Sequence, residues 1–153
     1  PFEKGFMSLD DEILALKSLP DDFKVGLAIN WARSAIEGRG FLTLIDHIKL
    51  ARENNLLSGL IFSGVSGKDD SYGVWKDSHM PFEKSFDIKY FQEGSLLTNS
   101  NIKKTFEALD LQRLDYIGVK LLSMPIDGSS IERRVGVNRD AITVLNNIQH
   151  DAF

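Results

Sequence analysis

Ser58-Gly59-Leu60-Ile61-Phe62-Ser63-Gly64 is a short apolar stretch bounded by small and polar residues. Such a stretch is typical of a β-strand that is buried on both faces. Two comparable stretches flank it in the chain, Phe23–Ile29 before it and Asp115–Leu122 after it. The three stretches together predict three buried strands, and buried strands of this kind are characteristic of parallel sheets.

Segments with helical periodicity alternate with these strands. Three of them are marked by sequences that resemble capping boxes, and a fourth has apolar residues at helical spacing. The boxes are Ser8–Asp11, Thr43–Asp46 and Ser129–Glu132, the periodic segment is Asn101–Leu109, and a last helical segment runs from about Arg139 to Ile148. The resulting order α-β-α-β-α-β-α predicts a single α/β domain over residues 1–153, in which helices cover a parallel sheet.

A parallel sheet of three strands would leave both of its edges open. The chain also begins at Pro1 with a helix and without a methionine. We therefore expect the remaining strands to lie in sequence that precedes Pro1.

Composition narrows the classes of function. The chain has 153 residues, of which 42% are hydrophobic and 26% charged, and a formal net charge of −4. An acidic chain without a basic patch is not expected to bind nucleic acid or an anionic membrane surface. No apolar run approaches the about 18 residues that a membrane span needs, and no secretory signal is visible, so a cytoplasmic protein is expected. The absence of cysteine excludes disulfides, thiolate metal sites and a cysteine nucleophile.

Polar residues follow the first predicted strand. The segment 30–39 is interpreted as a loop that contains two arginines, a carboxylate and an indole, supplied by Arg33, Arg39, Glu37 and Trp31. Sites in parallel α/β folds form at the carboxyl ends of the strands, and arginine suits bidentate binding of a carboxylate or phosphate. The alternative is that Arg33 or Arg39 pairs with Glu37 in a salt bridge that stiffens the loop.

A long segment without predicted secondary structure, about residues 64–97, follows the second strand. Loops of this length are often functional. Within it, Asp77 precedes His79 by two residues, so the carboxylate could orient the imidazole, or both could bind a metal or a substrate hydroxyl. The alternative is a surface histidine in a turn closed by Pro81.

Lys120 lies inside the third apolar stretch, where a lysine is expected to be paired or functional if it is buried. It could bind a substrate oxyanion, phosphate or carboxylate, or act as a base. The alternative is a lysine that extends into solvent at a strand end. His47 and His150 fall in helical segments and are assigned to solvated or packed helix faces.

Four motifs together resemble a bacterial family of unknown function that is grouped with the xylose isomerase-like barrels, the superfamily of sugar isomerases and epimerases. These motifs are Val25–Ser34, Gly59–Gly64, Trp75–Pro81 and Gly118–Leu122. The resemblance implies that the chain is the C-terminal portion of a (β/α)8 TIM barrel, with about three parallel strands and four helices. The three strands would then be the sixth, seventh and eighth of the barrel.

Members of that superfamily bind one divalent cation, such as Mn²⁺, Zn²⁺ or Mg²⁺, through two glutamates, an aspartate and a histidine. The cation polarises a ketose carbonyl and stabilises the enediolate. In this chain Asn30 stands at the position that resembles the aspartate ligand, and Lys120 replaces the last-strand glutamate. Only His79, together with Asp77, resembles a retained metal ligand, and further ligands would precede Pro1. Lys120 could replace the cation electrostatically.

The resemblance therefore implies an enzyme that isomerises or epimerises a small sugar or sugar phosphate. The expected catalytic residues are His79, Lys120 and Glu37, and the expected substrate-binding residues are Asn30, Trp31, Arg33, Arg39, Ser63, Trp75 and Asp77. The alternative is a non-catalytic sugar or metabolite binder that has kept the barrel and lost the metal site. An endonuclease-like relative is disfavoured by the acidic charge. A second copy of the chain is a possible partner.

Overall fold

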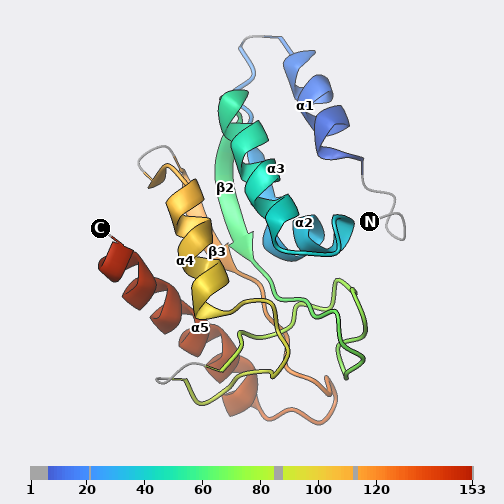
Figure 1. Ribbon diagram of the computed structural model, residues 1–153, viewed down its shortest axis with the longest axis vertical. Helices are drawn as coiled ribbons and strands as arrows, with labels where there is room; N and C mark the ends of the chain where they lie inside the picture. Colours follow the sequence, from blue (N-terminus) through green and yellow to red (C-terminus); the bar gives the residue numbers. More distant parts are fainter. Residues whose placement is uncertain (1–6, 21, 85–87, 112–113, 153) are drawn as a thin grey trace.

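The computed structural model describes residues 7–20, 22–84, 88–111 and 114–152. Within these residues it is a mixed α/β structure with one three-stranded parallel sheet and five helices (Figure 1). Along the chain the elements are α1 (Leu9–Lys17), β1 (Leu27–Asn30), α2 (Trp31–Glu37), α3 (Leu42–Glu53), β2 (Leu57–Phe62), α4 (Asn99–Ala108), β3 (Tyr116–Val119) and α5 (Ile131–Ala152).

The sheet has the order β1-β2-β3, and both pairs of strands are parallel. The register places Ile29 beside Leu60 and Leu60 beside Ile117. All three predicted strands are present, although β1 and β3 are shorter than the apolar stretches that predicted them. The expected burial on both faces is wrong for β3, which has no buried residue, and for β1, where Ala28 is exposed. Neighbouring strands are also consecutive in the sequence, so each connection is a crossover that contains at least one helix.

One face of the sheet is packed against the helices. Leu60 and Phe62 alternate along β2 and are fully buried, and the ring of Phe62 lies 5.8 Å from that of Phe106 on α4. Successive helices also pack against each other, α2 on α3, α3 on α4 and α4 on α5. In Figure 1 these helices and strands form a curved double layer, with the segment that follows β2 (green to yellow) gathered at the end toward which the β2 arrow points.

The predicted capping boxes have different outcomes. Ser8 caps α1, because its Oγ accepts a hydrogen bond of 3.2 Å from the backbone N–H of Asp11. The Ser129–Glu132 box is wrong by one residue: Ser130, not Ser129, caps α5 by accepting 3.1 Å from the N–H of Arg133. The helix is continuous from there rather than beginning near Arg139. The box at Thr43 is wrong: α3 begins at Leu42, and Thr43 packs on Gly38, where a Cβ would collide with it.

The interpretation of residues 30–39 as a loop is also wrong. Asn30 is the N-cap of α2, and its Oδ1 accepts a hydrogen bond of 3.2 Å from the N–H of Arg33. The helix forms because Trp31, Ala35 and Ile36 are buried against the core, so the apolar residues of this segment serve packing. Its polar residues occupy the remaining positions of a short helix.

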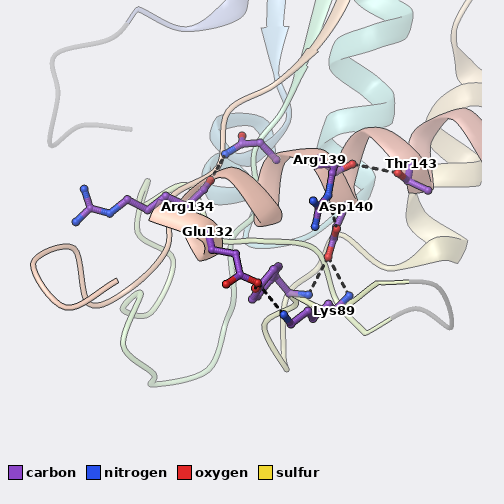
Figure 2. Close-up of polar contacts among 8 residues, drawn as sticks. Lys89, Glu132, Arg134, Arg139, Asp140 and Thr143 are labelled. Atoms are coloured by element: carbon purple, nitrogen blue, oxygen red, sulfur yellow. Dashed lines mark hydrogen bonds and ion pairs between the residues drawn. The ribbon is translucent and has the colours of Figure 1, made fainter. Parts of the chain in front are cut away.

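The long segment between β2 and α4 is fastened to α5. The carboxylate of Asp140 accepts hydrogen bonds of 2.9 Å from the backbone N–H groups of Lys89 and Tyr90, as Figure 2 shows for Lys89. Glu132 receives 2.9 Å from the ammonium of Lys89 and 2.7 Å from the hydroxyl of Tyr90, and these bonds lower the pKa of Glu132. The Tyr90 ring lies on Gly136, where a side chain would displace it.

We predict that Gly136→Ala lowers the free energy of unfolding by about 1–3 kcal/mol, because the new methyl group must push Tyr90 away from α5. Alanine is otherwise favoured over glycine in a helix by about 1 kcal/mol, so the predicted sign opposes helix propensity. Urea unfolding measures the change. Asn146→Ala at an exposed position of the same helix is the control and should be neutral or slightly stabilising; a stabilised Gly136→Ala would contradict the packing.

Candidate functional site

The carboxyl ends of the three strands meet at one edge of the sheet, because the strands are parallel. Hydrogen bonds keep the following segments together beyond that edge. The backbone N–H of Lys120 donates to the carbonyl of Phe62 at 2.9 Å, and that of Leu122 donates to the carbonyl of His79 at 2.8 Å. The position of Lys120 is therefore beside that of Ser63, in continuation of the register that pairs Phe62 with Val119.

The long segment folds back on itself after β2. Gly64 and Met80 form an antiparallel bridge with two backbone hydrogen bonds, of 3.0 and 3.1 Å. A Cβ at Gly64 would collide with the carbonyl of Met80, so the close approach depends on glycine. The bridge brings Ser63 and His79, sixteen positions apart in the sequence, to the same place.

Four polar side chains meet there: Arg33, Ser63, Asp77 and His79, which we call the Asp77–His79 cluster. The imidazole Nδ1 of His79 lies 3.1 Å from the hydroxyl of Ser63 and 3.2 Å from Oδ1 of Asp77. The other carboxylate oxygen of Asp77 lies 3.6 Å from Nε of Arg33 on α2. The Asp77 side chain is only 3% exposed and that of His79 14%, so this is a shielded group and not a histidine in a surface turn.

The backbone at this edge is locally strained. The structure describes four non-glycine residues with positive φ, and three of them are Arg39, Trp75 and His79, at 52°, 50° and 58°. Such conformations cost free energy and persist only where the surroundings impose them, and they are concentrated at functional sites. All three were predicted site residues.

Arg39 and Trp75 lie against each other. The guanidinium of Arg39 lies 5.8 Å from the centroid of the Trp75 ring, which also contacts Gly67. Like the Arg33–Asp77 ion pair, this stack joins the α2–α3 region to the long segment. Stacking of a sugar on Trp75 stays a prediction.

Other predicted site residues have different surroundings from those expected. Trp31 is fully buried, and its indole N–H donates to Thr105 at 3.2 Å, so it is a core residue with no face open to a ligand. Lys120 lies just beyond β3 and is exposed, as the alternative interpretation expected of a lysine at a strand end. Arg33 pairs with Asp77, and among the described residues neither Arg33 nor Arg39 forms an ion pair with Glu37, so the alternative of a loop-stiffening salt bridge is wrong.

Glu37 instead contacts His47. The carboxylate Oε2 of Glu37 lies 3.9 Å from Nε2 of His47, whose Nδ1 is 2.9 Å from the hydroxyl of Ser34. Sequence reasoning missed Ser34 and His47, because it placed Ser34 in a loop and assigned His47 to a helix face. Asn30, Arg33 and these three residues line one small pocket beside β1.

The donors of the Asp77–His79 cluster do not fit a divalent cation. One carboxylate oxygen of Asp77 faces a guanidinium, and the Nδ1 of His79 faces Ser63 and Asp77 itself. The residues described include no group of three or more His, Asp or Glu side chains that could hold a metal ion. Asn30 caps a helix and Lys120 is a cation, so neither supplies the missing anionic ligand.

Tyr72 anchors the long segment to the chain after β3. It is buried, its hydroxyl donates to the carbonyl of Leu122 at 3.0 Å, and it accepts 3.1 Å from the N–H of Met124. Burial raises the pKa of Tyr72, and the hydrogen bond from Met124 partly offsets the effect. These contacts join the loop that carries Asp77 and His79 to the segment that follows Lys120.

The fold and this cluster define an α/β protein with a shielded aspartate–histidine pair at the carboxyl edge of a parallel sheet. The chain belongs to the family described as a domain of unknown function (DUF4862), whose model matches residues 1–137. An uncharacterized protein of Salmonella typhimurium is 34% identical over 142 residues, which are 93% of this chain and 42% of that protein. The chain thus spans less than half the length of this relative. No solved structure matches it. In the part of the chain that the structure describes, no helix has the length and apolarity needed to cross a membrane.

We predict that stability falls as the pH rises above about 10, the ordinary pKa of tyrosine, because the folded state holds the Tyr72 proton more tightly than the unfolded state does. Tyr72→Phe should flatten this dependence. It should also lower the free energy of unfolding at pH 7 by about 1–2 kcal/mol, since Leu122 and Met124 lose a partner. Urea unfolding across pH 7–11 tests both effects. Tyr116 is exposed, so Tyr116→Phe is the control and should have the same dependence of stability on pH as the wild-type protein. If Tyr116→Phe flattened the dependence as much as Tyr72→Phe, the pH effect could not be assigned to Tyr72.

Proposed function

We propose that the chain forms the C-terminal part of a (β/α)8 barrel that acts on a small sugar or sugar phosphate by proton transfer, as an isomerase or epimerase. The sheet order supports the barrel, since consecutive parallel strands with helices between them are its repeating unit. The open edges at β1 and β3, and a relative more than twice as long, are compatible with further strands. The cytoplasm as location and association of copies of the chain stay predictions.

The Asp77–His79 pair is the observation that carries the proposal. The hydroxyl of Ser63 is within hydrogen-bond distance of Nδ1 and orients the imidazole, and the shielded carboxylate of Asp77 lies 3.2 Å from the same nitrogen, where its negative charge would favour a ring that takes up a proton. The ring then presents Nε2 on its opposite side. An imidazole held in this way suits removal of a proton from the carbon next to a carbonyl group and its return to the adjacent carbon or to the opposite face.

The other residues have supporting roles in this proposal. Lys120, exposed at the end of β3, would stabilise the oxyanion that forms when the proton leaves, in place of a metal ion. Ser63 and Arg33 hold the two ends of the cluster, and Arg39 on Trp75 offers a cation for a phosphate or carboxylate. The proton moves from substrate carbon to His79 and back, so no oxidant or second substrate is required.

The alternative is a sugar or metabolite binder without chemistry. The poor fit of the cluster to a metal ion favours it over a conventional metal-dependent member of the superfamily. Binding without proton exchange would distinguish the two functions.

We predict deuterium incorporation next to the carbonyl when the protein is incubated in D2O with D-xylulose, D-ribulose 5-phosphate or D-fructose 6-phosphate, followed by NMR with and without Mn²⁺. His79→Gln should reduce the rate by about 10²-fold or more, because the acid–base group is lost. Lys120→Met should reduce it while leaving substrate-free stability unchanged.

His150→Gln and Lys76→Met remove an exposed histidine and an exposed lysine and are the matched controls, which should retain the wild-type rate. A wild-type rate of deuterium exchange in His79→Gln would contradict the catalytic role of His79. Saturable binding without exchange would replace the enzyme by the binder. The absence of both binding and exchange would refute both functions for these substrates.

A further inference from the structure

Arg33 reaches Asp77 from α2, a helix of seven residues. A helix this short is not stable by itself, so its orientation depends on contacts with its neighbours. Asn30 fixes the N-terminal end as its cap. Burial of Trp31, Ala35 and Ile36 sets which side of α2 faces the core, and the polar contacts beside that side decide the exact rotation from which Arg33 reaches Asp77.

Two side chains of α2 meet a single residue of α3. Ser34 is buried and its hydroxyl lies 2.9 Å from Nδ1 of His47, while Oε2 of Glu37 lies 3.9 Å from Nε2 of the same ring. The His47 side chain is 16% exposed and projects from a helix whose neighbouring positions Leu44, Ile48 and Ala51 are fully buried. The imidazole therefore stands at the rim of the α2–α3 contact with a polar partner at each nitrogen.

Helical spacing connects these contacts to the cluster. Ser34 and Glu37 are three positions apart and share a face of α2, as does the cap residue Asn30. Arg33 is four positions before Glu37, so its side chain lies on the same side of α2, and it lines the pocket beside β1 together with Ser34, Glu37 and His47. When His47 holds Ser34 and Glu37, it therefore also fixes the position on α2 from which Arg33 reaches Asp77.

We infer that His47 is a positioning residue: through Ser34 and Glu37 it sets the rotation of α2 that places Arg33 against Asp77 and thereby maintains the Asp77–His79 pair. The relevance of this role to catalysis rests on the proposed function, in which His79 is the acid–base group. The structural role itself does not depend on any substrate.

The test is the NMR signal of the Arg33 Nε–H group, assigned with Arg33→Lys. Nε is buried, so its proton is shielded from solvent, and the neighbouring carboxylate of Asp77 makes its chemical shift sensitive to their separation. His47→Leu keeps a similar volume and removes both polar contacts, and we expect the signal to shift or to broaden beyond detection. Ser34→Ala, a smaller change, should shift it in the same direction if His47→Leu does not fold.

Two conservative variants separate the contacts. Asn in His47→Asn can place an amide nitrogen where Nδ1 lies, and Gln in His47→Gln can place one where Nε2 lies. We expect His47→Asn to restore the Arg33 signal toward the wild-type position, because the 2.9 Å contact with Ser34 is the shorter one. His47→Gln should restore it less.

Leu50→Ala is the matched control, a partly buried position on α3 outside the Ser34–His47–Glu37 group. It should lower the melting temperature without moving the Arg33 signal. An unchanged signal in folded His47→Leu or Ser34→Ala, or an equal shift in Leu50→Ala, would overturn the positioning role. If none of the sugars exchanges with wild-type protein, the proposed function fails, while the Arg33 signal still decides the role of His47.

Discussion

The middle strand β2 forms hydrogen bonds along both of its edges, with β1 on one side and β3 on the other, and it buries Leu60 and Phe62 beneath the helices. The two other strands and helices α2 and α3 contact this strand directly. Its pairing puts the carboxyl ends of all three strands at one edge, and the burial of its side chains draws α3 and α4 onto the same face. The rest of the structure depends on this one strand, since a three-stranded sheet has no second strand that is paired on both sides.

The candidate site is an extension of that pairing. The bridge between Gly64 and Met80 returns the chain to the end of β2, and the backbone bonds of Lys120 and Leu122 continue the β2–β3 contact past the sheet. The backbone before Asp77, at Trp75, and the backbone after it, at His79 and Met80, consequently form hydrogen bonds with neighbouring segments. These bonds hold Asp77 and His79 in place. Tyr72, Asp140 and Glu132 fasten the remainder of the long segment to the chain after β3 and to α5. A segment whose described residues form no helix or strand is thereby held in place beside β2 and β3.

The strands and most helices could be predicted because their signals are local. Apolar runs, a serine at a cap and periodic side chains act within a few residues of each other. Helix α2 was missed because its signal is not local. Trp31 and Arg33 in one short segment indicate a polar binding loop, and only the burial of Trp31 in the folded protein shows that the segment packs against the core. The box at Thr43 failed because Gly38, outside the motif, decides what Thr43 contacts.

The sequence by itself determined the α/β class and the parallel sheet, since both follow from spacing along the chain, and it left the pairing of Asp77 with His79 as one of two alternatives. The tertiary structure alone decided that Arg33 joins Asp77, that Trp31 belongs to the core and that Ser34 and Glu37 meet His47. These contacts join residues that are brought together only when helices pack and loops close on the end of β2. No local sequence pattern predicts these contacts, because they form only after the apolar side chains of several elements are buried together.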